Sequence, residues 1–149
     1  MIGVLVASAA LAAAPEYLTE VVSAPVETTG TASDIAARGR RCIASTFGSG
    51  VAGGELIVSD SDNVIVARNA SSYMDGLLKW QIRARVTFEA RDGRFRISQT
   101  ALERFNDRGG GWSGIGKWRG AGWQKAEAAY ASSAAALTEC VTAEQADDW

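Results

Sequence analysis

Within residues 77–91 apolar and polar side chains alternate, and this is the strongest pattern in the chain. The alternation predicts a strand of an antiparallel sheet that has one covered face and one face open to solvent. The dipeptide Asp92-Gly93 follows and predicts a two-residue hairpin turn that places Arg91 opposite Arg94. On this register, apolar residues pair on the covered face and opposite charges pair on the open face. The covered face should carry Trp80, Ile82, Ala84, Val86, Phe88 and Ala90, and the open face Lys79, Gln81, Arg83, Arg85, Thr87, Glu89 and Arg91.

Two other stretches have apolar residues at helical spacing and predict two helices. The first begins at a capping-box pattern, Thr31 to Asp34, and ends at the four glycines within 48–54. The second is rich in alanine and runs from Trp123 to about Thr142. The inward stripe of the first helix should hold Ile35, Gly39, Cys42, Ile43 and Phe47, and that of the second Ala126, Tyr130, Ala134, Leu137 and Val141.

Further strands are predicted at 16–24, 55–59 and 63–68, with residues 60–62 as a turn between the last two. The element order is therefore strand, helix, four antiparallel strands, helix. Because the open face of the sheet is charged, both helices have to cover the apolar face. The sequence predicts an α+β fold, a two-layer sandwich with an antiparallel sheet of four to five strands and two helices on one face.

The chain of 149 residues is long enough for one domain. Residues 1–14 are apolar and uncharged, and a helix of this length would reach about 21 Å, short of the ~30 Å that a membrane requires. Such a segment fits a secretory signal, with small residues at 10–12 for cleavage, and the alternative is a buried N-terminal strand or helix. We expect no membrane span and a periplasmic or secreted protein. The expected divisions are a signal peptide at 1–12, an N-terminal strand and linker at 13–30, a single domain at 31–143 and an acidic tail at 144–149.

The helix sequence DIAARGRRCIASTF and the hairpin sequence VTFEARDGRFRISQTALER, residues 86–104, resemble a secreted bacterial domain family of unknown function. Members of that family have a TATA-binding-protein-like fold, and the resemblance extends over residues 17–141. It implies a fold and an exported location, but it implies no reaction. The DNA-binding role of the protein that gives the fold its name does not transfer, because function resides in sites and not in folds. We expect no nucleic-acid partner.

Cys42 and Cys140 are the two cysteines of the chain. In an exported protein an even pair is most simply one disulfide, and this one would join the two helices side by side. The alternative is two separate buried thiols. A redox-active pair is disfavoured because the two cysteines lack C-x-x-C spacing.

The chain lacks the residues that several kinds of catalytic or metal site require. The chain has no histidine, the commonest general base, and two cysteines cannot form a four-thiolate zinc site. Residues 111–118 nearly match a phosphate-binding loop, but Trp118 replaces the hydroxyl that would hold Mg²⁺. Asp60 and Asp62 lack the glycine and distal glutamate of a calcium loop, and no S-x-x-K pattern occurs. We therefore expect no catalytic residues, no metal and no cofactor.

The net charge of −2 conceals an uneven distribution. Residues 64–125 carry a net charge of +7, and much of it belongs to the predicted open face. A basic face attracts anionic partners, such as an anionic glycan, a lipid headgroup or an acidic protein surface, and the alternative is a merely solvated face. Tryptophans in the glycine-rich segment 108–122 would suit sugar stacking or a protein partner, and the alternative is a lid over the sheet edge or core. The candidate binding residues are Arg83, Arg85, Arg94, Arg96, Trp112 and Trp118.

The sequence thus favours an exported, non-catalytic binding or interaction module that uses its basic sheet face. The alternative is a small carrier whose apolar ligand lies between the sheet and the C-terminal helix. A sheet of four to five strands is narrow for such a carrier.

Overall fold

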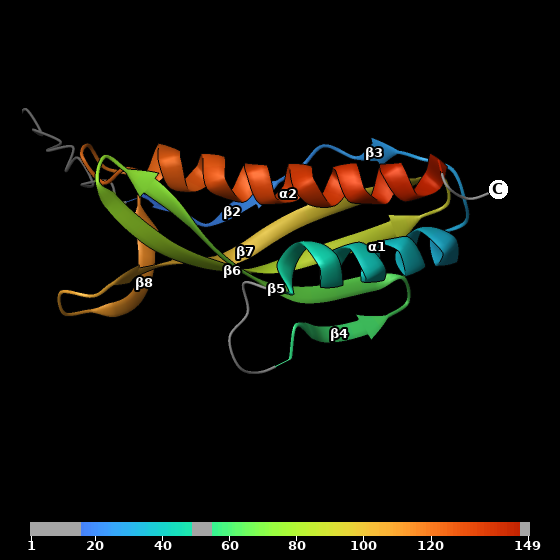
Figure 1. The fold of residues 1–149 in the computed structure, drawn as a ribbon, viewed down its shortest axis with the longest axis horizontal. Helices are drawn as coiled ribbons and strands as arrows, with labels where there is room; N and C mark the ends of the chain where they lie inside the picture. Colours follow the sequence, from blue (N-terminus) through green and yellow to red (C-terminus); the bar gives the residue numbers. More distant parts are fainter. Residues whose placement is uncertain (1–15, 49–54, 147–149) are drawn as a thin grey trace, which may run out of the picture.

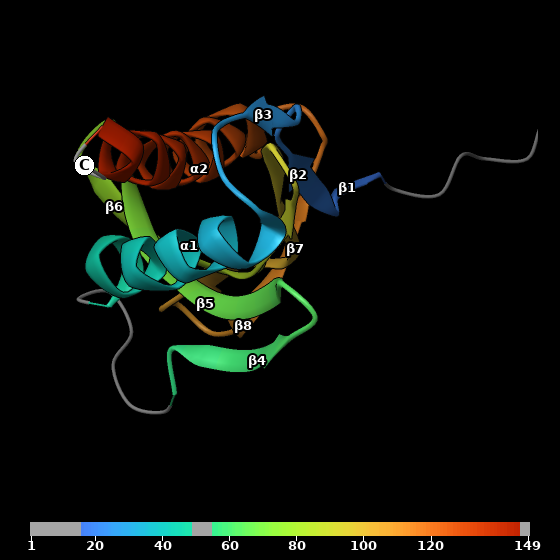
Figure 2. The same cartoon turned by 90° about the vertical axis from the view of Figure 1, so that its right-hand side faces the viewer.

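A curled antiparallel sheet and two long helices form the protein in the computed structural model, which describes residues 16–48 and 55–146 (Figure 1). Both helices lie on the same side of the sheet (Figure 2), so the predicted α+β class and its layering are confirmed. The elements are β1 (Tyr17–Leu18), β2 (Glu20–Val22), β3 (Val26–Glu27), α1 (Ala32–Phe47), β4 (Ile57–Ser61), β5 (Val64–Asp75), β6 (Leu78–Arg91), β7 (Arg94–Asn106), β8 (Gly111–Gly116) and α2 (Trp123–Ala146).

The sheet is wider than the sequence predicts, because the described residues form eight strands and not four or five. Strands β4, β5, β6 and β7 lie side by side in that order. The outer edge of β7 is shared, since β3 and β2 pair with its first half and β8 pairs with its last residues. Strand β1 then pairs with β8. The segment predicted as one strand at 16–24 is divided into β1, which pairs with β8, and β2, which pairs with β7.

The hairpin of β6 and β7 has the predicted register, with Arg91 opposite Arg94 and Gly93 in the left-handed conformation at φ 74°. The predicted alternation is also confirmed, because the covered-face residues from Ile82 to Ala90 are buried, while Trp80 at the end of the row is half-buried. The loop between β4 and β5 turns one residue later than expected, at Asp62-Asn63, where both residues have positive φ.

Strand β5 extends to Asp75, seven residues beyond the predicted end at 68. The added residues, NASSYMD, lack the apolar alternation that marks a half-buried strand. They form a strand because β6 supplies a continuous row of backbone partners, from Val64 opposite Glu89 to Asp75 opposite Leu78. Pairing with a long neighbouring strand therefore overrides a weak local pattern.

Helix α1 begins at the predicted capping box. The Asp34 amide donates a hydrogen bond of 3.2 Å to the Thr31 hydroxyl, and the Thr31 amide donates one of 3.2 Å to the Asp34 carboxylate. Gly39 lies against the Phe88 ring, and Phe88 stacks on Phe95 with ring centroids 5.1 Å apart. Helix α2 ends at Ala146, so it includes the first residues of the predicted acidic tail.

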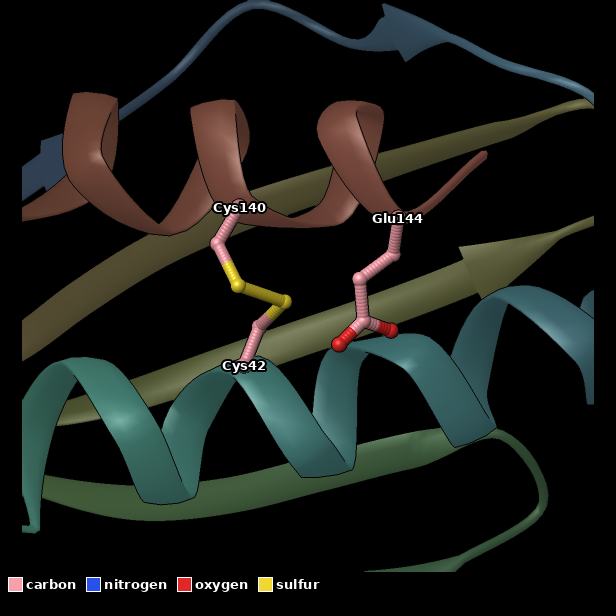
Figure 3. A group of neighbouring side chains, drawn as sticks. All are labelled: Cys42, Cys140 and Glu144. Carbon is pink, nitrogen blue, oxygen red and sulfur yellow. A yellow bond between two sulfur atoms is a disulfide. The ribbon is translucent and has the colours of Figure 1, made fainter. Parts of the chain in front are cut away.

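A disulfide joins Cys42 of α1 to Cys140 of α2, as expected, with Cα atoms 5.8 Å apart and a sequence separation of 98 (Figure 3). It links the two helices within the main core, where Cys42 is fully buried and Cys140 packs against the cluster. No helix within the described ranges is long and apolar enough to cross a membrane. The predicted signal peptide at 1–12 lies outside the described residues.

Candidate functional site

The open face of the sheet, the face turned away from both helices, is hollowed. Strands β4 and β8 lie on this side of the central strands (Figures 1 and 2), and they contribute Val58 and Trp112 to the lining of the hollow. The resulting hollow has a volume of about 870 Å³, within the roughly 300–1,000 Å³ typical of small-molecule sites. We call it the open-face hollow. It is lined by Val58, Arg68, Asn69, Ala70, Ser71, Ser72, Lys79, Gln81, Ile82, Arg83, Ala84, Arg85, Ala101, Glu103 and Trp112.

Two β-bulges help to shape the open-face hollow. In β4 the register shifts by one residue at Val58, which is 44% exposed. In β7 the register shifts at Ala101, because Arg83 faces Glu103 while Arg85 faces Thr100. Ala101 adopts a left-handed conformation with φ 52°, which is uncommon for a residue other than glycine. A bulge bends its strand and increases the local twist, so the sheet curves at this point.

A buried tyrosine supports the bulge in β7 from the core side. The Tyr130 hydroxyl lies 2.9 Å from the carbonyl oxygen of Arg83 and 3.2 Å from that of Glu103, and it donates its proton to this pair. Gln99 donates to the Tyr130 carbonyl at 2.7 Å, and Asn69 donates to the Gln99 side chain at 2.9 Å. Burial raises the pKa of Tyr130 well above its usual range, so the hydroxyl stays protonated as a donor.

One wall of the open-face hollow brings together two residues that the sequence singled out. The Arg83 guanidinium forms an ion pair of 3.0 Å with Glu103 and lies over the Trp112 ring, 4.2 Å from its centroid. Trp112 also contacts Phe105, with ring centroids 5.4 Å apart. Trp112 lies on a strand that the sequence did not predict within the glycine-rich segment, because residues 111–116 form β8 and pair with the end of β7.

Three further cations that line the open-face hollow have no carboxylate partner within the described ranges. Arg85, predicted from the sequence, lies directly opposite Arg68 on β5, and both side chains are exposed. Lys79 lies further along β6. Within the described ranges, none of these three side chains forms an ion pair or a side-chain hydrogen bond. Arg68 was missed by the sequence analysis because its position depends on the pairing of β5 with β6, which no local pattern specifies.

Arg94 and Arg96, the other two predicted arginines, lie away from the open-face hollow. They border a separate hollow of about 230 Å³ near the β6–β7 turn. There the Glu89 carboxylate pairs with Arg91 at 3.1 Å and with Arg96 at 3.1 Å. The hydrogen bond from Arg91, together with that from Arg96, holds the pKa of Glu89 below its usual range. The charge of Arg96 is therefore partly neutralised within the protein.

Trp118 is also separate from the open-face hollow. Its ring is 52% exposed and meets Tyr17 of β1 edge-on, with centroids 5.9 Å apart. The ring covers Gly116, where a Cβ atom would lie only 1.7 Å from it, so a larger residue at this position would displace the ring. Trp118 therefore covers the edge made by β1 and β8, which is the lid arrangement that the sequence left open as an alternative.

Cys42, Cys140 and Glu144 place their sulfur and carboxylate atoms within 4.8 Å of one another (Figure 3). The two sulfur atoms are bonded to each other, so neither is a thiolate that could bind a metal. Glu144 forms an ion pair of 2.9 Å with Arg41. This group links the helices and is not a metal centre in the oxidised protein.

The residues that line the open-face hollow are better suited to binding an anion than to transferring protons. Its cations exceed its carboxylate by three, and arginine stays protonated at any ordinary pH. Its single carboxylate, Glu103, is engaged by Arg83. The interface between the sheet and the helices is filled by side chains of 0–1% exposure, including Phe88, Phe95 and Tyr130, so nothing there favours the apolar-ligand carrier.

No family model and no curated protein matches this chain. Two solved structures are similar to it. A DUF4468 family protein from Bacteroides ovatus has a TM-score of 0.68 and 10% sequence identity, with 82% of this chain and 85% of that chain covered. A TBP-like protein from Parabacteroides distasonis has a TM-score of 0.66 and 11% identity, with 82% and 91% covered. The expected likeness to bacterial domains of unknown function with a TATA-binding-protein-like fold is confirmed, and at these identities it establishes the fold alone.

Proposed function

We propose that this protein is an exported, non-catalytic binding module whose anionic ligand occupies the open-face hollow. One observation carries the proposal: four cationic side chains and one carboxylate border this concave space, and three of the cations have no ion-pair partner within the described ranges. A concave site lined by one sign of charge focuses the field and concentrates oppositely charged ligands.

Export rests on two features. The apolar, uncharged segment 1–14 fits a secretory signal. The disulfide between α1 and α2 is of the kind that persists in oxidising compartments such as the periplasm or the cell exterior. The proposed location is periplasmic or extracellular.

The charge pattern of the open face supports binding over simple solvation. Near the β6–β7 turn one carboxylate, Glu89, pairs with both Arg91 and Arg96. Among the described residues that line the open-face hollow, only Arg83 has a carboxylate partner, and the other three cations line the same space without one. The concave shape suits a compact anionic group of a glycan or lipid better than a flat protein surface, because small ligands bind in concave sites.

The proposal is tested by measuring the affinity of the protein for a fluorescently labelled dextran sulfate oligomer. We compare the wild type with two variants of equal net charge. One reverses two cations of the open-face hollow, Arg68→Glu with Arg85→Glu, and the control reverses two exposed arginines outside it, Arg94→Glu with Arg108→Glu. Since a hydrogen bond to a charged group contributes about 1.5–3 kcal/mol, the first variant should bind at least about tenfold more weakly, and the control should stay within about threefold of the wild type.

The affinity of the wild type should also fall as salt shortens the Debye length from about 10 Å at 0.1 M to about 3 Å at 1 M. Equal losses in the two variants would mean that only net charge matters. That result, or an affinity independent of salt, would refute the open-face hollow as the binding site. Both variants change exposed residues, so unchanged thermal unfolding serves as the control for folding.

A further inference from the structure

We propose that Arg68 and Arg85 form a two-arginine clip for the terminal phosphate of a phosphate monoester. The inference rests on the proposed function, because it identifies the anion that the open-face hollow binds. Three features of the structure carry it: the direct opposition of the two arginines, their lack of a carboxylate, and the polar surface that continues beside them.

Arg68 and Arg85 occupy directly opposed positions on β5 and β6. The Cβ atoms of such a pair are about 4.5–5.5 Å apart, so the two side chains leave the backbone side by side on the open face. Like charges directly opposite each other destabilise a sheet. An anion held between the two guanidinium groups would convert this repulsion into attraction.

A second arginine pair shows how the protein balances such a repulsion elsewhere. Arg91 and Arg94 also lie directly opposite each other, beside the β6–β7 turn. There Glu89 binds Arg91 at 3.1 Å and supplies a negative charge from within the chain. No carboxylate plays this part at Arg68 and Arg85 within the described ranges. A ligand would have to supply it.

The chemistry of two guanidinium groups selects a doubly charged anion with several oxygen atoms. Each arginine presents a planar fork that binds two oxygens, and phosphate is a preferred partner of this geometry. A phosphate monoester carries about −1.5 to −2 charges at pH 7 and has three terminal oxygens, which matches two forks and two positive charges. A carboxylate or a phosphodiester carries a single negative charge, which leaves one guanidinium uncompensated.

The open-face hollow also extends beyond the clip. Gln81 and Ser72, a directly opposed pair, and then Lys79 continue the lining along β5 and β6. Lys79 is six residues from Arg85, about 20 Å along the strand. The group that carries the phosphate should therefore be polar, such as a sugar or glycerol moiety, and long enough to reach these side chains.

The test compares three small probes by calorimetric titration at pH 7.5: glycerol 3-phosphate as the monoester, glycerophosphoglycerol as the diester and glucuronate as the carboxylate. The wild type should bind the monoester at least about tenfold more tightly than either of the others, and this affinity should fall as the pH drops through about 6, where the second phosphate proton is taken up. Arg68→Lys and Arg85→Lys keep the charge but remove the fork. Each should weaken monoester binding at least about fivefold, while Arg94→Lys should leave it within about twofold.

Vesicles distinguish a lipid source from a free phosphate. Vesicles that contain phosphatidic acid present a monoester, and vesicles with the same content of phosphatidylglycerol present a diester. Preference for phosphatidic acid with weak binding of glycerol 3-phosphate would support a lipid headgroup, and tight binding of glycerol 3-phosphate would support a free phosphate. Equal binding of monoester and diester in both formats would overturn the clip, as would a lysine variant that binds like the wild type.

The failure of this inference is separable from the failure of the proposed function. If the probes bind alike but dextran sulfate binding still depends on Arg68 and Arg85, the open-face hollow binds anions and the monoester preference is wrong. If dextran sulfate binding does not depend on these residues, the proposed function itself is wrong.

Discussion

The Tyr130→Phe substitution removes one hydroxyl from beneath the open-face hollow and leaves the ring in place. The hydroxyl is the donor to the carbonyl oxygens of Arg83 and Glu103 at the bulge in β7. Tyr130 is fully buried, so water cannot replace the lost donor without a rearrangement. Leaving a buried polar group unsatisfied costs about 1–3 kcal/mol. The phenylalanine ring still fills the space of the tyrosine ring, so the substitution leaves no large cavity. We expect the free energy of unfolding to fall by about 2 kcal/mol at pH 7.

The same residue predicts how stability depends on alkaline pH. The pKa of Tyr130 is raised in the folded protein, so the folded state holds the proton more tightly than the unfolded state does. The stabilisation by the protonated hydroxyl is complete below the unfolded pKa of about 10 and is lost as the pH rises above it, by up to about 1.4 kcal/mol per pH unit. Phenylalanine has no such proton, so the difference between wild type and variant should shrink above about pH 10.

Urea unfolding followed by tryptophan fluorescence at pH 7, 9 and 10.5 measures both effects. Tyr17→Phe is the matched control, because the Tyr17 side chain is 46% exposed on β1 and should have little effect. If the wild type and Tyr130→Phe have the same free energy of unfolding at pH 7, the Tyr130 hydroxyl does not stabilise the bulge in β7. If the difference in the free energy of unfolding between the two proteins stays constant from pH 7 to 10.5, the loss of stability at alkaline pH does not come from this hydroxyl.

Three further variants test what holds the helices in place. Replacing both Cys42 and Cys140 by alanine should lower the free energy of unfolding by about 2–5 kcal/mol in urea titrations, because the bond closes a long loop, and no change would mean that the disulfide does not constrain the unfolded chain. Gly39→Ala should lower the melting temperature, because the new Cβ would lie 2.4 Å from the Phe88 ring and overpacking costs about 1–3 kcal/mol, more than the gain of up to about 1 kcal/mol in helix propensity; a higher melting temperature would contradict the close packing. Thr31→Ala removes the cap of α1 and should cost about 1 kcal/mol by chemical denaturation, whereas an unchanged midpoint would show that the capping box contributes nothing.

The features that the sequence predicts well are those determined by neighbouring residues. The turn at Asp92-Gly93 sets the register of its hairpin, and the alternation in β6 identifies the buried face. The capping box at Thr31 marks the start of α1. Each of these depends on a turn geometry or a side-chain period that a short stretch of sequence contains.

The features that the sequence missed depend on contacts between distant segments. Strand β8 forms because β7 offers a free edge, although residues 108–122 are rich in glycine. The bulge at Ala101 appears only when β6 and β7 are aligned, and no residue type marks it. Arg68 enters the open-face hollow for a similar reason, since its place opposite Arg85 depends on the alignment of β5 with β6.

The candidate site was therefore predicted in part. The charge of the open face and two of its arginines followed from the alternation in β6. The structure then divides the predicted residues, placing Arg83, Arg85 and Trp112 in the open-face hollow and Arg94 and Arg96 beside a smaller one. Alternation identifies the face on which a side chain lies, but it does not indicate where that face is hollowed.

The most direct measurement is an NMR titration of the arginine side-chain Nε–Hε signals with the dextran sulfate oligomer. If the open-face hollow binds the anion, the signals of Arg68 and Arg85 should shift most, with that of Arg83 responding beside them. The signals of Arg94 and Arg96 should move little at the same concentrations. Shifts that are largest at Arg94 and Arg96, or equal at all five arginines, would contradict the open-face hollow as the binding site.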